Sequence, residues 1–129
     1  MESLVIDGKH VIVQEDDAVL TVAFADRPDQ PTTYLLLQRL ISPTEQDKRL
    51  GHDKVYIELN EQSHSAYGGI KQVQLRNNRL LLRLDDKTAS LLDADQDLEV
   101  ELRSDAKEVA NLHAQLKRLF AGQATTIES

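Results

Sequence analysis

Histidines next to carboxylates are the residues of this chain whose types could support acid–base or metal chemistry. The chain has four histidines: His10, His52, His64 and His113. His52 and His64 flank the segment 54–60, and the carboxylates near them belong to Asp53, Glu58 and Glu61. Such groups could form a metal-dependent hydrolytic site or line a small-ligand site. No HExxH, HxH or other paired spacing supports this alternative.

The sequence also gives little support for a nucleophilic site or a phosphate-binding loop. Ser63 and Ser65 adjoin His64, but neighbours on a strand point to opposite faces, so a Ser–His pair has poor geometry there. The pair Gly68-Gly69 lacks the further glycines and the lysine of a phosphate-binding loop. The chain contains no cysteine, which excludes a thiolate nucleophile and a Cys-ligated metal. We therefore expect no cofactor, no bound metal and no enzymatic activity.

The charge of the chain indicates which kinds of partner it can bind. There are 15 basic and 22 acidic residues, a net charge of −7. Acids dominate residues 1–30 and 93–105, whereas the locally basic segment 71–87 lacks the exposed aromatic residues that stack on bases. Such a surface repels nucleic acid and attracts a basic protein. Without a membrane-spanning run or a secretory signal pattern, we expect a cytoplasmic location and no membrane partner.

The apolar pattern predicts mostly strands. They are expected at residues 10–14, 18–25, 33–41, 54–60, 70–76, 79–84 and 97–102. A turn is predicted at residues 15–17, where three acids follow one another. Residues 70–76 and 79–84 should pair as a hairpin across Asn77 and Asn78, with Arg76 opposite Arg79. The glycine pair at 68–69 should introduce a bulge or bend that re-aims the strand after it.

Helices are predicted at three places. The longest connection, residues 42–53, could hold one helical turn that begins at Pro43. A short helix is expected over residues 86–92. A long helix should follow Asp105, because Asp105 and Glu108 have the spacing of a capping box. Its apolar face would comprise Val109, Leu112, Leu116, Leu119 and Phe120, and the tail 123–129 is predicted to fray.

Together these elements predict an α+β fold. We expect a single, mostly antiparallel, curled sheet of about seven strands, with one short helix and a C-terminal helix packed on one face. A chain of 129 residues is long enough for one domain and too short for two ordinary ones. That domain should span residues 1–129, with its core at about 10–121.

A succession of short motifs then points to a family. They are YLLLQR (34–39), EQD (45–47), LG (50–51), YIELN (56–60), YGGI (67–70) and LLLRLD (80–85). In this order and spacing the chain resembles the immunity protein 10 family over roughly residues 10–120. These bacterial proteins are encoded beside polymorphic toxins, and each neutralises its own toxin. The resemblance implies a non-enzymatic antitoxin that binds a toxin domain, and the acidic charge makes a basic nuclease toxin a hypothesis.

The proposed contact face joins the outward side of segment 54–60 to the loop before it. Its residues are Glu45, Asp47, Asp53, Tyr56, Glu58 and Tyr67. Tyrosine is favoured at the centres of interfaces, and acids would steer a basic partner. Two alternatives stay open: the tyrosines could pack a minor core while the acids face solvent, or an open sheet edge could pair with a second copy to form a homodimer.

Overall fold

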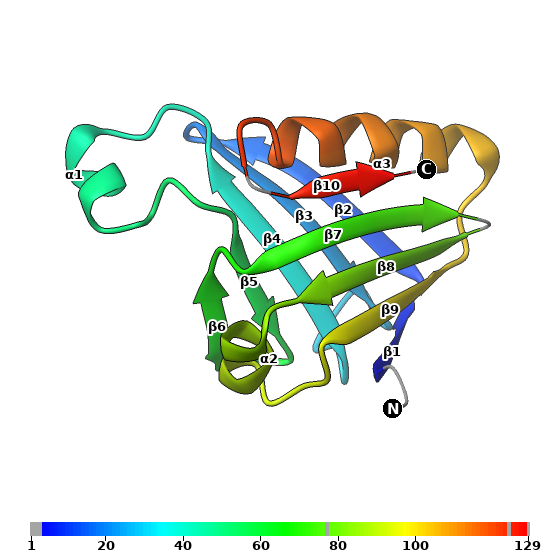
Figure 1. Ribbon diagram of the computed structural model, residues 1–129. Coiled ribbons are helices and arrows are strands. Elements are labelled where there is room, and N and C mark those ends of the chain that lie inside the picture. Colours follow the sequence, from blue (N-terminus) through cyan, green and yellow to red (C-terminus); the bar gives the residue numbers. More distant parts are fainter. Residues whose placement is uncertain (1–3, 77, 124, 129) are drawn as a thin grey trace.

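The fold is built from two β-sheets. In the residues that the structure describes, 4–76, 78–123 and 125–128, the computed structural model shows two five-stranded sheets and three helices. The sheets face each other, and their strands run in different directions (Figure 1). The α+β class is confirmed, whereas the predicted single sheet of about seven strands is wrong.

Sheet A and sheet B take their strands from different parts of the chain. Sheet A consists of β1 (Leu4–Gly8), β9 (Asp97–Leu102), β8 (Arg79–Leu84), β7 (Ile70–Arg76) and β10 (Thr126–Glu128), in that spatial order. Sheet B consists of β2 (His10–Asp16), β3 (Val19–Ala25), β4 (Tyr34–Leu40), β5 (Tyr56–Leu59) and β6 (Glu61–Tyr67). The helices are α1 (Glu45–Arg49), α2 (Asp86–Leu91) and α3 (Ala106–Leu119).

Sheet B is an antiparallel meander, in which each strand pairs with the next along the chain. The first hairpin corrects the predicted turn at residues 15–17. Asp17 and Ala18, with φ of 50° and 61°, make a two-residue turn between β2 and β3. Because two residues suffice for this turn, Glu15 and Asp16 stay in the strand, where their carboxylates are exposed.

Sheet A is mixed, because both of its edge strands run parallel to their neighbours. β1 pairs with β9, and β10 pairs with β7. The predicted fraying of the tail is therefore wrong for residues 125–128, and the hydroxyl of Thr125 donates to the carbonyl of Ile70 at 2.6 Å. Each edge strand pairs with a strand that lies far from it in the sequence, so no local sequence pattern predicts the pairing.

The central hairpin of sheet A forms as predicted. Arg76 pairs with Arg79, and the buried pairs on the inner face are Val73–Leu82 and Leu75–Leu80. Asn78 has a φ of 63°, which this turn requires and which asparagine tolerates. Asn77, the other predicted turn residue, lies outside the described residues.

The core lies between the two sheets and includes one face of α3. Leu112, Leu116, Leu119 and Phe120 of the helix segment are at most 3 % exposed. The predicted capping box is confirmed, since the carboxylate of Asp105 accepts from the Glu108 N–H at 2.8 Å and Glu108 reaches back to the Asp105 N–H. The start of α1 differs from the prediction, because Thr44 is the N-cap and Pro43 therefore precedes the helix.

The glycine pair marks the corner at which the chain leaves sheet B and enters sheet A. Gly68 and Gly69 have φ of +77° and +84°, and the register of β7 shifts directly afterwards, which confirms the predicted bend. A Cβ on Gly69 would lie 1.7 Å from Oγ1 of Thr88, which is buried in α2. The carbonyl of Gly69 also accepts from the N–H of Asp85 at 2.9 Å. The corner therefore has no room for a side chain.

Gly69→Ala is expected to lower the free energy of unfolding by about 3 kcal/mol or more, because steric overlap adds to the left-handed backbone. Gly122→Ala is the matched control, since its φ is +74° and a Cβ there would meet nothing within 4 Å. The control should lose only about 1–2 kcal/mol. Urea unfolding of both variants measures the difference, and equal losses would contradict the steric account.

Candidate functional site

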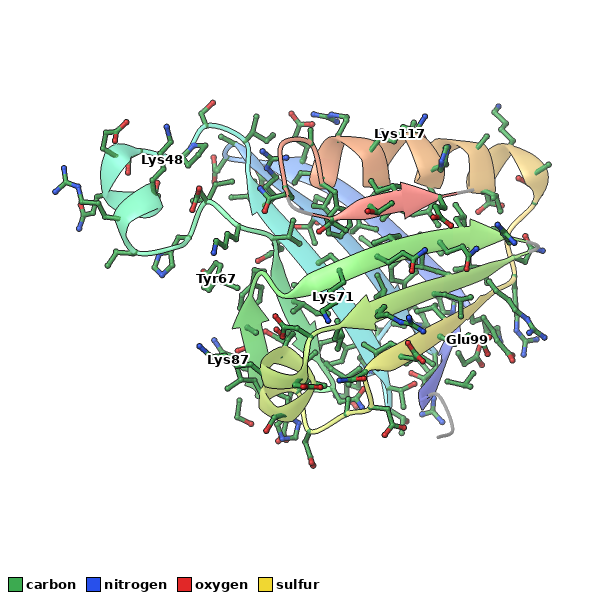
Figure 2. The ribbon with its side chains drawn as sticks, in the orientation of Figure 1. Lys48, Tyr67, Lys71, Lys87, Glu99 and Lys117 are labelled. Carbon is green, nitrogen blue, oxygen red and sulfur yellow. The ribbon has the colours of Figure 1, made fainter. Side chains whose placement is uncertain are left out.

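All of the tyrosines in the chain gather on the outer face of sheet B. The three are Tyr34, Tyr56 and Tyr67. Tyr56 and Tyr67 are cross-strand partners, and their ring centroids lie 5.1 Å apart at a tilt of 55°. The ring of His52 stacks on Tyr67 at 4.6 Å and 24°. Tyr67 is 47 % exposed, at the end of β6 on the side from which α1 projects (Figure 2). We call these four residues with Glu58 the tyrosine cluster.

Glu58 joins the two inner tyrosines of the cluster. Its Oε1 accepts from the hydroxyl of Tyr56 at 2.6 Å, and its Oε2 accepts from the hydroxyl of Tyr34. Burial and then the bond to Glu58 raise the pKa of Tyr34 to about 12. The same two causes raise the pKa of Tyr56. Both hydroxyls therefore stay protonated near neutral pH and donate to the carboxylate.

The outward residues of the three middle strands of sheet B carry almost no charge. Registers and alternating burial identify the outward residues of β3, β4 and β5 as Val19, Thr21, Ala23, Ala25, Tyr34, Leu36, Gln38, Leu40, Tyr56 and Glu58. Only Glu58 among them is charged. Next to the cluster, a hollow of about 100 Å³ is lined by His52, Tyr56 and Tyr67 together with the cationic residues Arg39 and Lys54. Strands β3, β4 and β5 therefore present aromatic and uncharged side chains around one carboxylate. Charged residues lie at the margins of this face, among them Asp16 of β2 and Glu61 of β6.

The outer face of sheet A is different, because ion pairs cover it. Arg79 lies 3.6 Å from Glu99, and Arg83 lies 3.1 Å from Asp97. Figure 2 shows Glu99 on this front sheet, away from Tyr67. Charges that already have partners on the same face favour solvent exposure over a close protein contact.

The loop around α1 projects away from both sheets (Figure 1). Glu45 is exposed there and lies 3.7 Å from Lys48. The carboxylate of Asp47 accepts from the backbone N–H and the hydroxyl of Thr44 at 2.8 and 2.9 Å, and these bonds lower its pKa. Asp47 is thus already used as the N3 residue of a capping box, whereas Glu45 remains available to a partner.

Asp53 follows His52 in the chain and lies near the corner between the sheets. It is half-buried, and its carbonyl accepts from Nε2 of Gln123 at 3.2 Å. It also lines a cavity of about 440 Å³ together with Gly68, Gly69 and Asp85. The six residues predicted as a contact face therefore fall into three places: Tyr56, Glu58 and Tyr67 in the cluster, Glu45 and Asp47 on α1, and Asp53 at the corner.

The histidines of the hydrolytic alternative have separate partners. His52 stacks on Tyr67, whereas Nε2 of His64 lies 3.3 Å from Oε1 of Glu61. The hydroxyl of Ser63 donates to Glu61, and that of Ser65 donates to the carbonyl of Gln62. Within residues 4–76, 78–123 and 125–128, no three His, Cys, Asp or Glu side chains are grouped closely enough to hold a metal.

Two members of the cluster were not part of the predicted contact face. Tyr34 opens β4, and the pairing of Leu36 with Glu58 brings it diagonally across from that carboxylate. His52 was assigned only to the hydrolytic alternative. The hydropathy pattern of each strand indicated which residues face outward, but only the pairing of β4 with β5 and of β5 with β6 shows that these side chains touch.

An exposed aromatic group on a sheet face with few charges is typical of a protein-binding surface. The model of the family Immunity protein 10 matches residues 8–110, and the chain belongs to this family. An immunity role and a toxin as the protein partner follow from this membership. A comparison with curated proteins gave no match. In the described part of the chain, no helix has the length and apolar character needed to cross a membrane.

Tyr34→Phe is expected to lower the free energy of unfolding at pH 7 by about 1.5–3 kcal/mol, because the lost hydrogen bond is made to a carboxylate. Its pH dependence should also change. The pKa of Tyr34 rises from 10.0 to about 12 on folding, so the folded chain keeps a proton that the unfolded chain releases. Stability from this group therefore falls as pH rises from about 10 to 12, and the variant lacks that part of the fall.

Urea unfolding from about pH 8 to 12 measures both effects. Tyr67→Phe is the matched control, because among the described residues its hydroxyl makes no hydrogen bond, and we expect a change below about 0.5 kcal/mol. Curves for wild type and Tyr34→Phe that stay parallel above about pH 10 would contradict the role of the Tyr34 hydroxyl.

Proposed function

We propose that this chain is a cytoplasmic antitoxin that binds its cognate toxin domain directly and blocks it without catalysing a reaction. The observation that carries the proposal is the family match over residues 8–110. The two different outer faces and the projecting α1 loop are compatible with a role in protein binding. The toxin would be the product of the gene encoded beside this one.

The proposed contact surface is the outer face of sheet B with the α1 loop beside it. Tyr56, Glu58 and Tyr67 would lie near its centre, because tyrosine rings in contact supply area for binding at a low cost in conformational entropy. Glu45, Asp47 and Asp53 would lie toward the rim. Asp47 would contribute mainly by holding α1 in place, since its carboxylate is bonded to Thr44.

A basic nuclease is the toxin class that the charge of the chain favours. The net charge is −7, and a nuclease needs a positive surface to bind phosphates. Opposite charges speed association and suppress wrong partners. In this proposal the acidic chain covers the surface on which the toxin would bind nucleic acid, and does not itself bind nucleic acid.

Co-expression tests the proposed function. Cells that produce the neighbouring toxin domain should survive when this chain is also produced, and the two proteins should purify together as a complex. A toxin domain encoded elsewhere, beside an unrelated immunity gene, is the specificity control. Loss of cell growth together with no complex would overturn the antitoxin assignment.

Glu45→Lys is expected to slow association with the toxin domain by about two- to fivefold at low salt, with little change in dissociation. The difference should shrink at high ionic strength, because salt screens exposed charges. Glu101→Lys on the outer face of sheet A is the matched control, since it changes the net charge equally. Stopped-flow association at two salt concentrations measures the rates. Equal slowing by both variants would remove α1 from the interface.

A further inference from the structure

Glu58 is a carboxylate without an ion-pair partner among the residues that the structure describes. No lysine, arginine or histidine nitrogen of the described residues forms an ion pair with it within 4.0 Å, although the ion pairs on sheet A show that arginines reach acids there. The cations Lys54 and Arg39 line the hollow beside Tyr56 and Tyr67, and the Lys54 side chain packs beside Gly68. A half-buried charge of this kind gains from an external partner of opposite charge.

The two tyrosine hydroxyls hold the Glu58 carboxylate in one orientation. Tyr56 donates to Oε1 and Tyr34 donates to Oε2, so each oxygen has one bond from the protein. An ionised carboxylate offers about four acceptor positions, and two therefore stay free. One free acceptor position on each oxygen is the number that the paired N–H groups of a guanidinium require. An ammonium group lacks this planar, paired geometry.

The aromatic rings beside Glu58 suit the same group. The ring of Tyr56 contacts that of Tyr67, and the ring of Tyr67 stacks on His52. These rings form a continuous row where β5 begins and β6 ends. A guanidinium stacks on such rings while its edge bonds to a carboxylate. Leu36, directly across from Glu58 on β4, adds apolar surface for the methylene stem of an arginine.

We propose that Glu58, with the tyrosines around it, is a receptor for one arginine side chain of the toxin domain. This inference rests on the proposed function and names the chemistry that its contact surface recognises. Charge complementarity selects the occupant: the chain is acidic, Glu58 is the one charged residue among the outward residues of β3, β4 and β5, and its carboxylate is oriented by hydroxyls that have no charge of their own. Glu58 thus supplies specificity at the centre, whereas the acids of α1 supply steering at the rim.

Glu58→Gln tests the receptor, because glutamine keeps the shape of the side chain and an acceptor oxygen but removes the charge. Calorimetric titration with an inactive variant of the neighbouring toxin domain should show a dissociation constant raised at least about tenfold. Glu101→Gln on sheet A removes one charge from the other face, and it should stay within about twofold of wild type. A Glu58→Gln affinity within about twofold of wild type would overturn the inference.

The toxin side supplies the second measurement. Each surface arginine of the toxin domain is replaced by alanine and combined with Glu58→Gln in a double-mutant cycle. One arginine should show a coupling of about tenfold or more with Glu58 and no coupling with Glu101. If no arginine couples with Glu58, the arginine receptor is wrong.

Failure of the arginine receptor can be distinguished from failure of the proposed function. If Glu58→Gln unfolds the chain, Tyr67→Ala takes its place, because Tyr67 is 47 % exposed; it should weaken binding by about fivefold or more, and an unchanged affinity overturns the inference. Absence of binding by the wild-type chain overturns the proposed function as well. Binding by wild type that the variants leave unchanged overturns the receptor alone.

Discussion

The packing of sheet A against sheet B around one shared core determines the position of every outward side chain. Val22, Phe24, Leu35, Leu37 and Ile57 of sheet B are 0 % exposed. Because side chains alternate along a strand, burying these residues directs their neighbours to the opposite face. A shift of one residue in the pairing of β4 with β5 would send Tyr56 and Glu58 into the core. The tyrosine cluster therefore depends on the same apolar packing that stabilises the fold.

The turn at the glycine pair 68–69 determines how the chain passes from one sheet to the other. Gly68 and Gly69 let the chain turn from β6 in one sheet to β7 in the other, and the close contact of Gly69 with Thr88 brings α2 against the turn. α2 also contacts β6, the strand that carries Tyr67. One backbone constraint thus orders both the junction of the sheets and the end of the strand that presents the exposed tyrosine.

The outer faces of the two sheets differ in how their charges are paired. On sheet A, acids and arginines pair across neighbouring strands, so their charges are largely satisfied within the chain. On sheet B, the Glu58 carboxylate is oriented by neutral hydroxyls and forms no ion pair with the residues that the structure describes. The carboxylate of Glu58 is thus free to pair with a cation of another protein, which suits a chain that binds one specific basic partner. Membership in the Immunity protein 10 family implies that this partner is a toxin.

The sequence by itself determined the local elements and the family. The hairpin of β7 and β8, the capping box of α3, the bend at the glycine pair and the outward direction of Tyr56 and Glu58 all follow from spacing that involves a few neighbouring residues. The division into two sheets, the edge strands β1, β6 and β10, and the meeting of Tyr34 with Glu58 were decided only by the tertiary structure. β1 and β10 pair with distant segments, and β6 is a polar edge strand without a buried face, so none of them has the alternating pattern that marks a strand.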